Sequence, residues 1–236
     1  RWSLLRISPN ALFAATPVAA SDAADRDDAG RFSVFGRVEF AGVGRSATVL
    51  VHRDGLEWRL ASNGLPESAI QPRGGRVARY AVARWLTLLP AALRPAPTRM
   101  LVIGLGAGHS VEGLPASISA IDVVELEPQV VLANRALADR RRSDPLAEPR
   151  LQLHLGDGRT ALSLRRERFD AIVSQPSHPW TAGSASLFTQ EFFQLAHARL
   201  VPGGIFVQWI GLDFVDLPLL RSLVATLRAV FPFVEC

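Results

Sequence analysis

The sequence predicts an α/β fold in which a doubly wound, mostly parallel sheet follows a small antiparallel β-module. From residue 99 onward, short apolar segments alternate with helical segments, which is typical of parallel strands joined by helices. The apolar run 100–104 leads straight into glycines at 104, 106 and 108, as a buried strand does when it enters a tight turn. Residues 32–63 alternate between polar and apolar side chains, which predicts the antiparallel module.

Composition narrows the class of protein. A hydrophobic fraction of 48% in 236 residues is enough for a packed core, and no apolar run reaches the ~18 residues of a membrane span. All 26 basic residues are arginine, so lysine Schiff-base chemistry and a P-loop lysine are excluded. The single cysteine, Cys236, has no internal disulfide partner, which favours a reducing, cytoplasmic location.

The chain divides into four segments. Residues 1–30 are expected to be a linker or flexible segment, because their apolar patch is too short to cross a bilayer. The β-module is expected over 31–70, a connecting helix over 71–98 with apolar residues at helical spacing from Val77 to Leu89, and a nucleoside-binding core over 99–236. Strands of the module are predicted at 35–40, 47–51 and 56–60, and a turn at Asn63–Gly64.

The core is predicted to continue the alternation to its end. The expected strands are 100–104, 121–126, 151–155, 169–174 and 204–210, and the expected helices are 108–114, 128–139, 159–166, 186–199 and 216–230. Arg140–Arg142 lies in a polar stretch and is expected to form a solvated loop. Residues 231–236 are expected to begin a further strand, so the last strand is expected to be missing and one sheet edge exposed.

The glycine turn and the next strand end predict a nucleoside-cofactor site. Glu125 follows Gly104 by about 20 residues, the distance at which a strand-end acid can hold ribose hydroxyls. His109 stands where a dinucleotide fingerprint has its third glycine, which favours an S-adenosylmethionine-type binder over NAD. The alternative is a turn that serves packing alone.

Asp157 and Gly158 follow the third core strand. The acid can accept a hydrogen bond from an adenine amino group while the glycine admits the flat base. Asp157 also precedes a helical run, so it can cap that helix. Both roles remain open.

The loop after the fourth core strand carries the candidate chemistry. His178 is either a general base near neutral pH or a hydrogen-bonded loop histidine, and Trp180 is expected to form a wall of the pocket. The five histidines are scattered, so no metal site is expected. No nucleophile elbow and no nucleic-acid motif is visible.

From about residue 45 to 236 the chain resembles the spermidine synthase (polyamine aminopropyltransferase) family. It is most similar to the branch in which a synthase-like domain follows a membrane-embedded region. The segments that carry the resemblance are Leu60–Ser68, Val102–Gly108, Val124–Pro128, Gly156–Arg159, Phe169–Val173, Pro176–Trp180, Ala185–Phe193 and Leu200–Trp209.

The resemblance implies a Rossmann-like S-adenosylmethionine methyltransferase core and a site for S-adenosylmethionine or its decarboxylated form as donor substrate. Glu125 would hold the ribose, and Asp157 and Gly158 would meet the adenine. Gly104, Gly106 and Gly108 would line the donor's tail. It also implies tethering behind a membrane region on the cytoplasmic side.

The sequence departs from the family at its acids. The family has Asp-Ser-Ser-Asp-Pro after the fourth core strand, where this chain has Gln175-Pro-Ser-His-Pro179. The acid that the family places in the glycine turn is replaced by Ala107, and Glu67 is the one compensating carboxylate. Loss of these acids disfavours a cationic polyamine as acceptor.

Three hypotheses follow for function. The first is a spermidine synthase-like transferase with an altered acceptor site, in which His178 is the base and Gln175 and Ser177 orient a small-molecule acceptor that also contacts Glu67 and Trp180. The second is authentic aminopropyl transfer to putrescine. The third is a catalytically inactive, nucleoside-binding regulatory domain. No nucleic-acid partner is expected, and a homodimer is left open.

Overall fold

The computed structural model describes residues 37–75, 82–94, 98–177, 179, 181, 183–212 and 215–235. The chain forms two compact units. The first unit contains the chain up to residue 81 together with 106–109 and 127–146. The second unit contains residues 82–105, 110–126 and 147–236. Within the described ranges, no helix is both long and apolar enough to cross a bilayer.

The first unit contains the predicted antiparallel sheet, with one strand more than the sequence indicated. Its strands pair in chain order as β1 (Val38–Val43), β2 (Thr48–Asp54), β3 (Glu57–Ser62) and β4 (Leu65–Ile70). Asn63 and Gly64, with φ of 51° and 80°, form the predicted turn between β3 and β4. Trp58, Leu60 and Ile70 are buried in this sheet. β4 was not predicted because Pro66 and Glu67 interrupt its apolar pattern.

Helix α3 (Pro128–Ala136) belongs to the first unit and packs against β1 and β2. Its N-cap is Glu127, which is 4% exposed and accepts the Gln129 amide N–H at 3.1 Å. The other carboxylate oxygen accepts the backbone N–H of Ser46 at 2.9 Å, its hydroxyl at 2.8 Å and the Ala47 N–H at 3.2 Å. Glu127 therefore fastens the turn between β1 and β2 to the start of the helix.

The second unit contains a five-stranded sheet in which every pairing is parallel, as predicted. The strand order is β7-β6-β5-β8-β9. The order reverses beside β5, and in such sheets ligands bind where it reverses, at the carboxyl ends of the strands. The strand bounds are β5 Thr98–Ile103, β6 Ile118–Glu125, β7 Leu151–Leu155, β8 Phe169–Ser174 and β9 Leu200–Gln208.

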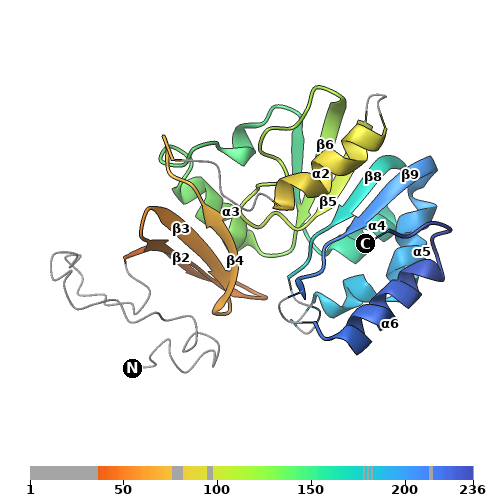
Figure 1. Ribbon diagram of the computed structural model, residues 1–236. Helices are drawn as coiled ribbons and strands as arrows, with labels where there is room; N and C mark the ends of the chain where they lie inside the picture. The colour runs from red at the N-terminus through yellow and green to blue at the C-terminus, as the bar shows by residue number, and fades with distance from the viewer. Residues whose placement is uncertain are drawn as a thin grey trace. The chain divides into compact units, whose positions relative to one another are not determined.

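Helices cover both faces of this sheet (Figure 1). On one face α2 packs against β8 and β9. On the other, side chains from α4 and α5 join Leu101 and Ile103 of β5 in one buried cluster. The helices and short 3₁₀ turns of this unit are α2 Val82–Leu93, η2 Pro145–Ala147, α4 Gly158–Leu164, η3 Ala185–Phe188, α5 Gln190–Ala198 and α6 Leu217–Arg228.

Two local predictions were wrong. Residues 108–114 were expected to be helical, but they form successive turns, because Gly108 and Gly113 adopt φ of 78° and 73°, which a right-handed helix does not allow. Arg141 was expected in a solvated loop, but it is 2% exposed. Its guanidinium is buried because it donates to Asn134 and to the carbonyl of Ala107.

Among the strands that the structure describes, β9 pairs with β8, and it begins irregularly. Leu200 pairs with Phe169, but the next pair is Ile205 with Ala171, so the intervening residues of β9 lie opposite the single residue Asp170. Pro202 and Gly203, whose φ is 71°, lie in this irregular part. The regular ladder therefore covers only the second half of the strand.

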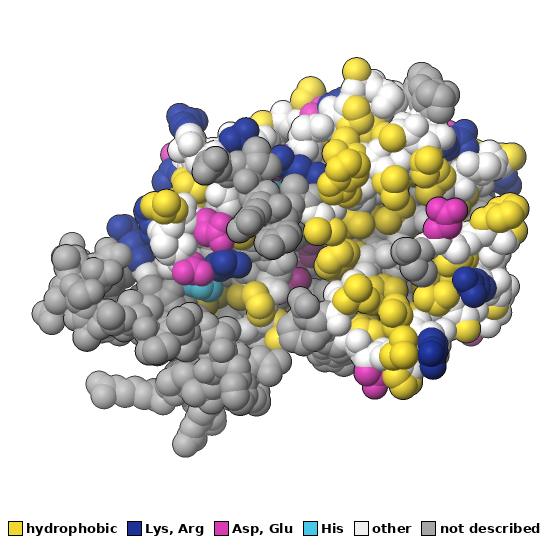
Figure 2. Space-filling model, in the orientation of Figure 1, with side chains coloured by type: hydrophobic (Ala, Val, Ile, Leu, Met, Phe, Trp, Pro, Cys, Tyr) yellow, Lys and Arg dark blue, Asp and Glu magenta, His cyan; other side chains and the backbone are white. Residues whose placement is uncertain are grey.

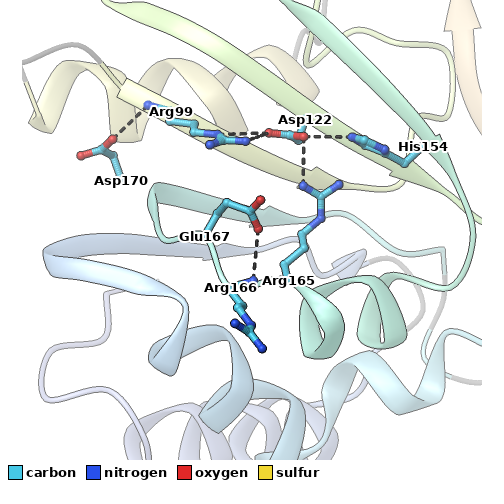
Figure 3. Close-up of polar contacts among 7 residues, drawn as sticks. All are labelled: Arg99, Asp122, His154, Arg165, Arg166, Glu167 and Asp170. Carbon is cyan, nitrogen blue, oxygen red and sulfur yellow. Dashed lines mark hydrogen bonds and ion pairs between the residues drawn. The ribbon is translucent and has the colours of Figure 1, made fainter.

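A buried carboxylate on β6 contacts side chains from both neighbouring strands (Figure 3). Asp122 of β6 is 2% exposed. One of its oxygens accepts from His154 at 2.9 Å and Arg165 at 3.0 Å, and the other accepts from the Arg99 guanidinium at 3.3 Å. Burial acts to raise the pKa of Asp122, but the hydrogen bond from His154 and the charges of the two arginines hold this pKa below its usual value. Asp122 therefore links β5, β7 and the segment that follows α4.

The outer side of α2 is apolar. Figure 2 shows apolar side chains on the surface where α2 lies. Val82, Trp85, Leu89 and Leu93 are exposed and recur every three or four residues along the helix. They therefore form one stripe on the helix, on the side away from the core.

Candidate functional site

The turn after β5 is built on left-handed glycines. Gly104, Gly106 and Gly108 have φ of 96°, 53° and 78°, which favour glycine over any other residue. The Gly104 N–H donates to the Val124 carbonyl at 2.8 Å, and a β-carbon on Gly104 would lie 2.8 Å from the Gln175 carbonyl oxygen. The start of the turn thus fits between the ends of β6 and β8 only because residue 104 has no side chain.

Glu125 stands at the carboxyl end of β6, beside that turn. Its side chain is buried, with 7% of the residue exposed, and one carboxylate oxygen accepts the Leu105 N–H at 2.8 Å. The end of β6 and the glycine turn are thereby held together by a charge-assisted hydrogen bond. A carboxylate fixed at this edge can accept hydrogen bonds from a pair of hydroxyls, and the role of Glu125 in holding a ribose stays a prediction.

The two acids at the end of β6 have different roles. Although burial acts to raise it, the hydrogen bonds from Ser46 and Gln129 hold the pKa of Glu127 below its usual value. Because four donors occupy the Glu127 carboxylate, this acid stabilises the first unit. Glu125 is the acid that the second unit places at the edge where ligands bind.

The structure confirms the capping role of Asp157. Its side chain accepts the Thr160 N–H at 2.7 Å and caps α4, and the neighbouring Gly156 N–H donates to the Glu125 carbonyl at 2.9 Å. The second role weighed for Asp157, a contact with adenine, stays a prediction. Gly158 is buried at the first position of α4, and a β-carbon there would overlap the Cγ2 methyl of Ile103.

Replacing Gly158 by Ala is therefore expected to lower the free energy of unfolding by about 1–3 kcal/mol, because the added methyl overpacks the core around Ile103. Urea denaturation measures the change. Ile103→Ala removes the opposing methyl, so the double variant should be less destabilised than the sum of the two single variants. Strict additivity would show that Gly158 is not required for this packing.

Gln175, a predicted catalytic residue, is fixed against the glycine turn. Its side-chain nitrogen donates to the Gly104 carbonyl at 2.7 Å and to the Ser110 hydroxyl at 3.0 Å. Both amide hydrogens are thereby used, so the amide oxygen is the group of this side chain that remains for a ligand. Ser177 follows on the same loop and is half-buried. His178 and Trp180 lie outside the described residues.

Two polar side chains at the same edge were not identified from the sequence. Ser174 and Gln208 end β8 and β9 and are paired in register. Within the described ranges, the buried Ser174 hydroxyl and the Gln208 side-chain oxygen have no hydrogen-bond partner. Both atoms can form a hydrogen bond with a ligand or an ordered water at this edge. Gln208 could have been recognised as a candidate from the sequence, because it is a polar residue at the end of an apolar strand.

The remaining predicted residues lie in the first unit. Glu67 lies at a bulge in β4, because Ser68 pairs with Leu60 whereas Pro66 pairs with Ala61. Bulges commonly re-aim a side chain beside a binding site. Gly106 and Gly108 complete the turn in this unit. No cluster of three or more His, Cys, Asp or Glu suited to a metal ion occurs among the described residues.

Comparison with known proteins gives consistent matches. The family model of the spermine/spermidine synthase domain matches residues 80–236. A polyamine aminopropyltransferase of Nitrosomonas europaea is 31% identical over 149 residues, which cover 62% of this chain and 46% of that protein. A putrescine N-methyltransferase of Nicotiana attenuata is 30% identical over 146 residues, which cover 61% of this chain and 39% of that protein.

Solved structures show the same fold. A spermidine synthase crystallised with the transition-state analogue AdoDATO superposes with a TM-score of 0.73 at 21% identity, covering 84% of this chain and 66% of that one. Spermidine synthase from Thermotoga maritima gives 0.69 at 22% identity, covering 84% and 65%. The chain thus spans about half the length of the curated relatives it matches, or somewhat less.

Proposed function

The chain belongs to the spermine/spermidine synthase domain family, and on that premise we propose that it is the core of a transferase that uses S-adenosylmethionine or its decarboxylated form. The observation that carries the proposal is the buried carboxylate of Glu125 at the end of β6, bonded to the first N–H after Gly104. An acid at this edge of a doubly wound sheet suits the ribose hydroxyls of a nucleoside. Asp157, at the end of the neighbouring strand β7, suits the adenine amino group.

The proposed acceptor site is less acidic than that of the family. Gln175 occupies the position of one family acid, and its amide nitrogen is already engaged by Gly104 and Ser110. An uncharged amide oxygen binds a polyamine cation less strongly than a carboxylate does. The unpartnered oxygens of Ser174 and Gln208 add two uncharged groups at the same edge. We therefore favour an acceptor other than a free polyamine.

The reaction proposed is displacement at a sulfonium carbon. The donor supplies an activated carbon bonded to positively charged sulfur, and the acceptor attacks that carbon. Such a step gains most of its rate from alignment and exclusion of water. Gln175 and Ser177 would orient the acceptor, and His178 would take up its proton.

Aminopropyl transfer to putrescine is the second candidate function. The relative from Nitrosomonas europaea is named a polyamine aminopropyltransferase, and Glu67 lies at the bulge in β4. Glu67 and His178 would then replace the missing acids. The relative from Nicotiana attenuata is named a putrescine N-methyltransferase. The relatives of this chain are therefore named for two different transferred groups, aminopropyl and methyl.

Calorimetric titration with both donors, followed by turnover assays with putrescine and a wider acceptor panel, tests the proposal. We expect donor binding with slow or absent conversion of putrescine and turnover of another acceptor. Conversion of putrescine at enzyme-like rates would support the second candidate. Donor binding with no turnover on any acceptor would support a regulatory domain. His178→Ala should abolish turnover and leave donor binding intact, and unchanged turnover would remove His178 as the base.

A further inference from the structure

A pair of buried side chains in the first unit holds the glycine turn by its carbonyls. Asn134 of α3 donates from its amide nitrogen to the Gly106 carbonyl at 2.8 Å and to the Val130 carbonyl at 2.8 Å. Arg141 donates to the Ala107 carbonyl at 2.6 Å and to the Asn134 side-chain oxygen at 2.6 Å. Both side chains are buried. We call the pair Asn134 and Arg141 the carbonyl clamp.

The carbonyl clamp determines which way the backbone donors of the turn point. The described peptide bonds are all trans, and in a trans peptide the N–H points opposite to the carbonyl of the preceding residue. Because the clamp draws in the carbonyls of Gly106 and Ala107, the N–H groups of Ala107 and Gly108 point away from it. Among the residues that the structure describes, neither N–H donates a hydrogen bond, although both residues are buried.

Two adjacent N–H groups in a left-handed turn form a concavity that binds anions. The buried donors need an acceptor, whereas the carbonyls of Gly106 and Ala107 already accept from Asn134 and Arg141. The turn also carries Ala107 rather than an acid. The chemistry presented here therefore matches a carboxylate better than an amine.

We propose that the carbonyl clamp makes the turn a carboxylate site, so that this chain selects S-adenosylmethionine, whose amino-acid tail keeps its carboxylate, over the decarboxylated donor. This inference rests on the proposed function and specifies its donor. The acceptor's lone pair forms a bond to a carbon on the donor's sulfonium sulfur, the bond from that carbon to sulfur breaks, and its electron pair stays on sulfur. The acceptor atom gives its proton to His178, the base proposed above.

Calorimetric titration with three ligands tests this inference and the proposed function separately. 5′-Methylthioadenosine has the nucleoside without the amino-acid tail, and the two donors differ only in the carboxylate. We expect S-adenosylmethionine to bind about 10-fold more tightly than the decarboxylated donor, the scale of one charge-assisted hydrogen bond. Equal or tighter binding of the decarboxylated donor would overturn the inference alone. Failure of all three ligands to bind would overturn the proposed function as well.

Variants test whether the clamp is responsible. Arg141→Lys cannot reproduce the two-pronged contact, so it should bring the ratio of the two dissociation constants close to one and change the affinity for 5′-methylthioadenosine less than 2-fold. The matched control is Arg150→Lys. Arg150 also holds backbone carbonyls, those of Leu114, Pro115 and Ile118, but away from the turn. Its loss should lower stability without changing the ratio.

If Arg141→Lys does not fold, a second variant tests the inference by reversing the preference between the two donors. Ala107→Asp places an acid in the turn and should invert the ratio in favour of the decarboxylated donor. An unchanged ratio in this variant, or the same change of ratio in Arg141→Lys and Arg150→Lys, would contradict the role of the clamp.

Discussion

Replacing Glu125 by Gln is expected to weaken the binding of 5′-methylthioadenosine on the order of 10- to 100-fold, because a hydrogen bond to a charged group contributes about 1.5–3 kcal/mol. The amide has nearly the shape of the carboxylate but no charge, and it turns one acceptor into a donor. That donor would face either the Leu105 N–H, which Glu125 accepts at 2.8 Å, or the nucleoside. Calorimetric titration measures the loss directly.

The matched control lies two residues away. Glu127→Gln removes charge from an acid that accepts from Ser46, Ala47 and Gln129, so we expect a loss of about 1–3 kcal/mol of stability with the nucleoside affinity unchanged in the folded protein. Loss of affinity in Glu127→Gln together with normal affinity in Glu125→Gln would reverse the roles assigned to the two acids.

Replacing Asp122 by Asn is expected to lower the free energy of unfolding at pH 7 by about 3 kcal/mol. Removing one partner of a buried ion pair typically costs about 3–5 kcal/mol, because the other charge remains without compensation. We expect the low end, because the Arg99 side chain is 39% exposed to solvent and water compensates part of its charge. Urea denaturation of both proteins measures the difference.

The pH dependence of this effect has a definite sign. The pKa of Asp122 is lower in the folded protein than in the unfolded chain. Its contribution to stability is therefore fully present above the unfolded value, about 3.9, and is lost as the pH falls through the lower folded value. The stability difference between the wild type and Asp122→Asn should be present at pH 7 and shrink below about 4.

The control for this experiment is Glu167→Gln. Glu167 lies close in sequence to Arg165 (Figure 3), but it is exposed to solvent, so no measurable change in stability is expected. A stability difference for Asp122→Asn that persists unchanged to the lowest pH at which both proteins fold would show that the charge of Asp122 is not its source.

Much of the fold could be predicted because its signals are local. The apolar strands of the second unit alternate with helices, and that pattern predicted parallel pairing before any contact was known. The region 108–114 failed because the glycines adopt left-handed angles that composition alone does not reveal. β4 was missed because its strand pairing tolerates Pro66 and a bulge at Glu67, which single-strand patterns do not show.

The candidate site was predictable where it follows strand ends. Glu125 ends an apolar strand, and Asp157 and Gln175 come just after two others, so the rule that ligands bind at carboxyl ends makes them candidates. Arg141 was misread because it sits in a run of three arginines beside acids, a pattern that is usually solvated. Its contacts with Asn134 and Ala107 depend on how α3 and the glycine turn pack in the first unit, and no local pattern encodes that packing.

The irregular start of β9 affects how the protein behaves at high concentration. An unpaired outer strand offers its backbone groups to another molecule, and long flat strands of this kind template aggregation. In β9, Pro202 lacks an N–H and Gly203 turns the backbone out of the strand conformation, so only Ile205–Gln208 runs in regular register with β8. An incoming strand would find a regular segment of about four residues to pair with, which is shorter than a typical strand of about 5–6 residues. Within the part of the chain that the structure describes, the irregularity therefore leaves an incoming strand little regular edge to pair with.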